Sequence, residues 1–161
     1  MSSSDRRTFL LAPLALAACG FTPSYGPQGG ARGIEGLIRV AEPRDKAAFD
    51  LVQRLEERIG RAGSPRFDLT YTIRTRNDRV GITPDNTIQR FHVTGTVDWS
   101  LIAVADGARV EGGTVQNFAA WSATGSTVAG LSAEEDAARR LMVMLADQIV
   151  TRLIATSGRW A

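Results

Sequence analysis

Apolar and polar residues alternate along two stretches in the middle of the chain. In the first stretch the apolar positions are Phe67, Leu69, Tyr71 and Ile73. In the second and longer stretch the corresponding positions are Phe91, Val93, Gly95, Val97, Trp99, Leu101 and Ala103. Because successive side chains of a β-strand point to opposite faces of its sheet, each stretch is predicted to be a strand with one buried face.

Two further segments complete the predicted sheet. Leu37–Val40 forms a short apolar run that Pro43 ends. Asp106–Gly107 is a hairpin turn signal, and the segment after it, residues 109–124, is predicted to be a less regular strand. Within that strand, Gly112–Gly113 is interpreted as the site of a β-bulge. The three strands that follow one another are therefore expected to pair as an antiparallel meander.

Two other segments have the apolar spacing of a helix. Residues 44–61 carry one apolar face, and a second helix is predicted to open at a capping box formed by Ser132 and Glu135 and to end near Ser157–Gly158. The apolar stripe of the first helix consists of Ala48, Leu51, Val52, Leu55 and Ile59, and that of the second of Ala138, Leu141, Leu145, Ile149 and Leu153.

The order strand, helix, three strands, helix predicts the fold class. Each amphipathic helix must bury its stripe, and one face of the sheet offers the surface for both. We therefore expect an α+β two-layer sandwich, with two helices on one face of a roughly four-stranded mixed or antiparallel sheet. Residues 34–157 are expected to form this single domain, followed by a short tail at 158–161.

The N-terminus has the pattern of a lipoprotein signal peptide. Arg6 and Arg7 precede an apolar run, Phe9–Ala18, that is too short to span a membrane, which takes about 20 residues. Leu16–Cys19 reads Leu-Ala-Ala-Cys, so residues 1–18 are expected to be removed and Cys19 to carry the lipid. A plain secretory signal beside a free cysteine and a short membrane helix are the alternatives.

Two questions about this region stay open in the sequence. Arg6–Leu10 resembles a twin-arginine export motif, but any positively charged signal start carries similar residues, so general secretion is an equal alternative. Residues 19–33 are rich in Gly and Pro and are predicted to be a tether. Gly20 stands where an inner-membrane retention signal would have Asp, which favours the outer membrane.

The composition excludes several kinds of site within one chain. Cys19 is the only cysteine and His92 the only histidine, so an internal disulfide, a thiolate zinc site and a two-histidine metal site are excluded. The net charge of +2 does not favour a nucleic-acid binder. His92 falls on the polar side of its strand without a recognisable nucleophile pattern, so the chain is interpreted as non-enzymatic and no cofactor is expected.

One group of cations is a candidate binding surface. Arg74 and Arg76 share the polar side of one predicted strand, and Arg90 and His92 share the polar side of the next. If these strands pair, the arginines form a patch that could hold the phosphates of an anionic glycolipid through charge-assisted hydrogen bonds. The alternative is an ordinary solvated sheet face, partly neutralised by nearby aspartates.

The whole layout resembles the LptE family of lipopolysaccharide-assembly lipoproteins, in its alphaproteobacterial form. The match is carried by Ala17–Gly26, which reads Ala-Ala-Cys-Gly-Phe-Thr-Pro-Ser-Tyr-Gly, and by the C-terminal helix from Ala137 to Leu153. The resemblance implies an outer-membrane lipoprotein, acylated at Cys19, that forms a plug in the barrel protein LptD. It further implies a role in barrel assembly and in lipopolysaccharide delivery to the outer leaflet, through an exposed surface that contacts lipopolysaccharide. No family motif fixes that surface, and Arg74, Arg76 and Arg90 are our candidates for it.

Two other functions are weighed against this one. An auxiliary lipid-binding lipoprotein of an ABC-type lipid transporter would also be a small α+β domain behind a lipidated cysteine. A periplasmic hydrolase would need His92 as its base, because no other histidine exists.

Overall fold

The computed structural model describes residues 33–82, 88–122 and 126–161. In chain order they form β1 (Ile38–Val40), α3 (Lys46–Ile59), β2 (Phe67–Ile82), β3 (Ile88–Ala103), β4 (Arg109–Ser122), α4 (Thr127–Thr156) and the short 3-10 helix η1 (Ser157–Arg159). The predicted signal peptide, Cys19 and all of the predicted tether but Gly33 lie outside the described residues.

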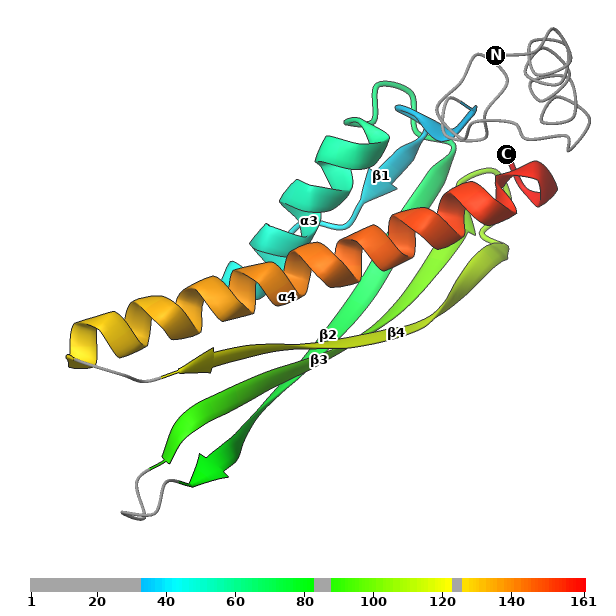
Figure 1. The fold of residues 1–161 in the computed structure, drawn as a ribbon. Coiled ribbons are helices and arrows are strands. Elements are labelled where there is room, and N and C mark those ends of the chain that lie inside the picture. Colours follow the sequence, from blue (N-terminus) through cyan, green and yellow to red (C-terminus); the bar gives the residue numbers. More distant parts are fainter. Residues whose placement is uncertain (1–32, 83–87, 123–125) are drawn as a thin grey trace, which may run out of the picture.

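The sheet is mixed, and both helices lie on one face of it (Figure 1). The strand order is β1-β2-β3-β4, with β1 parallel to β2 and the other neighbours antiparallel. The predicted α+β two-layer sandwich is therefore confirmed. The short first strand pairs in parallel because α3 carries the chain back across the sheet before β2 begins.

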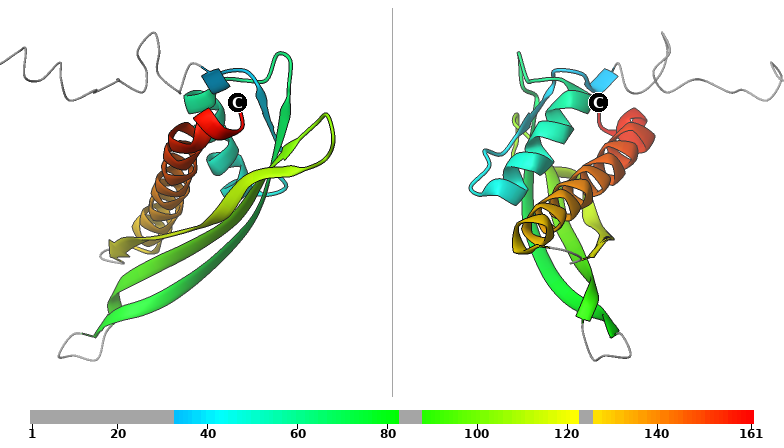
Figure 2. Two further views of the ribbon diagram at one scale, coloured as in Figure 1. Left: turned by 90° about the vertical axis from the view of Figure 1, so that its right-hand side faces the viewer. Right: turned by 60° about the vertical axis from the view of Figure 1, so that its left-hand side comes forward.

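The two long central strands give the molecule its elongated shape. β2 and β3 each contain 16 residues and pair from Phe67 with Ala103 to Ile82 with Ile88. Both strands curve, and their hairpin end projects beyond the helices (Figures 1 and 2). The opposite end of the molecule holds β1 and the C-terminus. The sheet therefore has a covered end, where the described chain begins, and a protruding hairpin end.

The core lies between the sheet and the helices. Alternate residues of β3, among them Val97, Trp99 and Leu101, are buried against the stripe of α4, whose Leu141 and Leu145 are fully buried. By length and composition α4 could span a membrane. Its apolar stripe is packed on the sheet, however, so we interpret α4 as the core helix of the domain.

A glycine on β3 sets how closely α4 approaches the sheet. A Cβ atom at Gly95 would lie 3.0 Å from Leu141 Cδ2 and 3.0 Å from Leu145 Cδ1. Such a separation is tighter than ordinary carbon–carbon contact. Gly95 therefore leaves room for two leucines of α4 that larger residues would displace.

The start of α4 differs from the prediction. The N-cap is Ser126, whose Oγ accepts a hydrogen bond from Ala129 N at 3.3 Å, so the prediction that the helix opens at Ser132 is wrong. Val128 and Leu131 in the additional turns are exposed, and no buried stripe therefore marks these turns in the sequence. Ser132 and Glu135 lie within the helix instead.

The predicted bulge at Gly112–Gly113 is also wrong. Both glycines pair in register with β3, and the register shift lies nearer the hairpin turn, where Leu101 pairs with Glu111 but Ile102 with Arg109. The glycines serve a packing role instead. A Cβ at Gly112 would lie 2.7 Å from the backbone oxygen of Trp99 and 2.3 Å from Arg109 Nη2, and one at Gly113 would lie 3.1 Å from Arg152 Nη1.

Ion pairs fasten the helices to each other and to β4. The carboxylate of Asp147 on α4 accepts from Arg54 at 3.0 and 3.1 Å and from Arg58 at 2.8 Å, and both arginines belong to α3. Glu111 on β4 accepts from Arg159 at 3.1 Å. These ion pairs link α3 to α4 and the C-terminal turn to β4.

Candidate functional site

The candidate site lies on the open face of the sheet, opposite the helices. The register of β2 and β3 places Arg74 opposite Thr96 and Arg76 opposite Thr94. Arg90 lies two residues before His92 on the same face of β3. The structure thus brings the three arginines proposed from the sequence onto one face of the β2–β3 hairpin.

Two of the three arginines already have acidic partners. Arg74 pairs with Asp98 on β3, and Arg76 pairs with Asp78 at 3.0 Å. Among the described residues Arg90 has no ion pair. Three arginines against two aspartates leave this surface with an excess of one positive charge, so it is less cationic than the arginines alone indicate.

The pairing changes the titration of one carboxyl group. A hydrogen bond from the Thr114 hydroxyl, and next a hydrogen bond from Arg74, hold the pKa of Asp98 below its usual range. Asp98 is therefore ionised at neutral pH and fixes one edge of the Arg74 guanidinium. The side chain of Arg74 is 64% exposed, so its other N–H groups remain accessible to a ligand.

An exposed aromatic ring belongs to this face and was missed by the sequence analysis. Phe118 on β4 is 55% exposed and contacts the His92 ring, with ring centroids 5.1 Å apart. Trp121 lies on the covered face, where it stacks on Phe91 at 4.3 Å. The odd separation of Phe118 and Trp121 along one strand was the signal that they lie on opposite faces.

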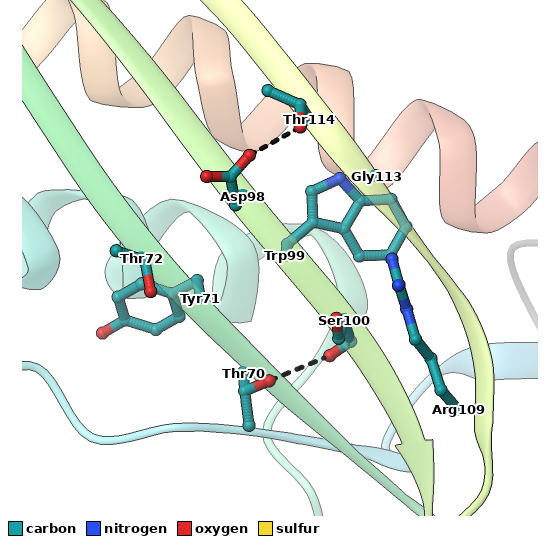
Figure 3. A pocket seen from close by; sticks show the side chains of 9 residues that line it. All are labelled: Thr70, Tyr71, Thr72, Asp98, Trp99, Ser100, Arg109, Gly113 and Thr114. Carbon is teal, nitrogen blue, oxygen red and sulfur yellow. Dashed lines mark hydrogen bonds between the residues drawn. The ribbon is translucent and has the colours of Figure 1, made fainter.

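A shallow pocket of about 400 Å³ lies on the same face, nearer the covered end of the sheet (Figure 3). Hydroxyl groups from three strands line it, together with the Asp98 carboxylate and the Arg109 guanidinium. These hydroxyls belong to Thr70, Thr72, Ser100 and Thr114. Such a surface offers many hydrogen-bond donors and acceptors and little apolar area, which suits a polar, hydroxylated or phosphorylated ligand.

His92 has two neighbours on the open face. Its ring contacts the aromatic ring of Phe118, and Asp78, its cross-strand partner on β2, is paired with Arg76. Within residues 33–82, 88–122 and 126–161 no group of His, Cys, Asp and Glu side chains could hold a metal ion. The fold and this surface together define a class: a small α+β domain with one covered and one polar, exposed sheet face.

The family comparison identifies the chain more closely. The model of the LptE family, described as lipopolysaccharide-assembly, matches residues 38–153, and the chain belongs to this family. The resemblance proposed from the sequence is therefore confirmed. The printed description of the family, lipopolysaccharide assembly, agrees with the role that the resemblance implied.

Solved structures share the fold. A putative lipoprotein from Caulobacter crescentus superimposes with a TM-score of 0.67 at 23% identity, covering 83% of this chain and 98% of that one. The rare lipoprotein B of Shewanella oneidensis has a TM-score of 0.57 at 12% identity, with 76% and 95% covered. A lipoprotein B of Nitrosomonas europaea has a TM-score of 0.58 at 10% identity, covering 77% of this chain and 85% of that one. Curated protein sequences give no significant match.

Proposed function

We propose that the protein is the lipid-anchored partner of an LptD-like outer-membrane barrel. It assists assembly of that barrel, sits in it as a plug, and helps deliver lipopolysaccharide to the outer leaflet. The family match over most of the folded domain is the observation that carries this proposal. The Leu-Ala-Ala-Cys sequence at Leu16–Cys19 supports an anchor at Cys19 in the outer membrane.

The shape of the domain is compatible with this role. The described chain enters at the end that holds β1, and the β2–β3 hairpin projects at the other end. At about 3.3 Å per residue, strands of this length extend for roughly 50 Å. A domain tethered at one end can therefore present its hairpin deep inside a barrel while its lipid stays in the membrane.

The open face provides the proposed lipopolysaccharide contact. Arg74 and Arg76 keep free N–H groups beyond those that their aspartates accept, and Arg90 has no ion pair among the described residues. Guanidinium groups bind phosphates bidentately, and these hydrogen bonds are stronger than those between neutral groups. We expect the phosphates of lipopolysaccharide to lie across these three residues.

A detergent pull-down of the tagged, full-length lipoprotein from outer membranes tests the partner. Recovery of a stoichiometric barrel protein, identified by mass spectrometry, is the expected result. Recovery with inner-membrane transporter subunits would instead support an auxiliary lipoprotein of an ABC-type transporter and overturn the barrel proposal.

Charge reversal tests the lipopolysaccharide contact. The double substitution Arg74→Glu and Arg76→Glu should weaken lipopolysaccharide binding at least tenfold. It replaces two side chains that donate hydrogen bonds to phosphate with two that carry the same negative charge as phosphate. Arg139→Glu, an exposed arginine on α4, is the matched control and should bind as the wild type. Unchanged binding by the double variant, with an unchanged melting temperature, would reduce the patch to an ordinary solvated face.

Metabolic labelling tests the anchor. A fatty-acid probe should label the wild-type chain and fail to label Cys19→Ala. Label that persists in this variant would show that the lipid is attached elsewhere and would remove the anchor from the proposal.

A further inference from the structure

β4 is an edge strand with a free side. Among the described residues it pairs with β3 alone. Three of its outward backbone groups are identified by their contacts: Gly112 N donates to Glu111 Oε1 at 3.1 Å, Phe118 N donates to Asn117 Oδ1 at 2.9 Å, and Ala120 O accepts from Arg140 at 3.3 Å. All three residues have even numbers.

Alternation along the strand then fixes the other outward groups. In an antiparallel strand the N–H and C=O of one residue point to the same side, and those of the next residue point to the other. The N–H and C=O groups of Thr114 and Gln116 therefore point away from β3. Within the described residues, these outward backbone groups of Thr114 and Gln116 have no hydrogen-bond partner. In this they differ from the outward groups identified at Gly112, Phe118 and Ala120.

This edge carries few of the features that prevent strand pairing. Natural edge strands are usually blunted by charged side chains, prolines, bulges or a covering segment. Residues 113–120 contain no charged residue and no proline, and they run in regular register with β3. The middle of β4 is thus a regular, uncharged edge of a kind that accepts another strand.

Positive charge borders the same edge. The charged side chains next to it, from β4, α4 and the C-terminal turn, are Arg109, Arg140, Arg152, Arg159, Glu111 and Asp136. Four arginines against two carboxylates leave an excess of two positive charges. A strand that docks here is therefore favoured when it carries acidic side chains.

We propose that the free edge of β4 binds an extended, acidic segment of the barrel partner as an added strand. The docked segment forms backbone hydrogen bonds with Thr114 and Gln116, and its acidic side chains lie near Arg140 and Arg152. This mode of recognition takes affinity from main-chain hydrogen bonds and specificity from alternate side chains. The inference rests on the barrel partnership of the proposed function.

Hydrogen exchange on the full-length protein is the first test. In the free protein the amides of Thr114 and Gln116 should exchange fast, whereas those of Val115 and Ala119, which face β3, should be protected. In the purified complex with the barrel all four should be protected. Protection of Thr114 and Gln116 already in the free protein would mean that another segment of this chain or a second copy covers the edge, and would overturn the proposal.

A proline on each edge of the sheet provides a matched pair of variants. Gln116→Pro removes one outward N–H of β4 and leaves the bonds to β3 intact, since proline is tolerated at edge positions. It should lower recovery of the barrel at least tenfold in the pull-down. Thr75→Pro makes the same change on β2, at a residue whose N–H points away from β3 on the other side of the sheet, and should recover the barrel normally.

The outcomes separate this proposal from the one on which it rests. If the wild type recovers the barrel and a folded Gln116→Pro does so equally well, the edge proposal fails and the partnership stands. If the wild type recovers no barrel, the partnership fails and the edge proposal falls with it. If Gln116→Pro does not fold, as seen by circular dichroism, the exchange of Thr114 and Gln116 in the complex decides alone.

Discussion

The two faces of the sheet are made of alternate residues of the same strands, yet they have opposite character. On β3, Val97 and Leu101 are fully buried beneath the helices, whereas Thr96, Asp98 and Ser100 between and beside them are part-exposed on the open face. The covered face is closed by helix packing and ion pairs. The open face carries hydroxyls, two salt-bridged arginines and an exposed phenylalanine.

The difference separates stability from binding. Burial of apolar surface supplies most of the free energy of folding, at roughly 25 cal/mol per Å². The covered face therefore tolerates few changes. The open face has little buried apolar area to lose, so its residues can serve a ligand at small cost to the fold. Neighbouring residues on one strand give the sharpest test of this division.

The largest contrast is expected between Leu101 and Ser100. Leu101→Ala should lower the free energy of unfolding by about 2–5 kcal/mol, because it leaves a cavity under α4. Ser100→Ala, one residue away on the open face, should change it by no more than about 0.5 kcal/mol. Urea denaturation of both variants measures the two values, and similar losses would remove the proposed division between the faces.

Gly95 tests the same contrast by addition instead of removal. Gly95→Val should destabilise the protein by about 1–3 kcal/mol, because its side chain would displace Leu141 and Leu145 of α4. Thr94→Val puts the same valine on the open face, in place of a branched side chain of equal size, and should be nearly neutral. Thermal melting of the pair is sufficient, and a neutral Gly95→Val would show that α4 can move away freely.

The sequence predicted the two faces well because strand periodicity alone decides them. The alternation of Phe67, Leu69 and Leu101 with polar residues gave the covered face, and the same parity put Arg74 and Arg76 together on the open face. The pairing of Arg74 with Asp98 also depends on the register between β2 and β3. The alternation within one strand does not show which residues of the next strand lie opposite it. The partial neutralisation of the arginines by aspartates could therefore be stated only as an alternative.

The errors have a common physical cause. The first turns of α4 carry exposed apolar residues, Val128 and Leu131, so the stripe that marks a helix is missing there. The glycines of β4 were interpreted from backbone freedom, whereas they make room for Arg109 and Arg152. Both features depend on which parts of the chain pack together, and a local pattern cannot report that.

A smaller effect is expected at the ion pairs between the helices. Asp147→Ala should cost about 1 kcal/mol, because it removes the ion pairs that join Asp147 to Arg54 and Arg58 on α3. The cost is small because all three side chains are roughly one-third exposed and partly screened by solvent. Asp136→Ala removes pairs that lie within α4 and should cost less. Urea denaturation at low and high salt measures both, and the loss at Asp147 should shrink as salt rises. An equal cost for the two variants would show that the link between the helices adds nothing beyond a surface pair.

The smallest effect is expected on the open face, where Asp98 links the two strands that flank it. Its pKa is depressed, so its interactions stabilise the fold above the pKa of the unfolded chain and are lost as the pH falls through the lower folded pKa. Titration of the Asp98 carboxyl by NMR should show this depressed value. Thr114→Val and Arg74→Gln should each raise the pKa, since the hydrogen bond from the Thr114 hydroxyl, and next that from Arg74, lower it in the wild type. A pKa that stays unchanged in both variants would show that these two contacts do not hold Asp98 in its ionised form.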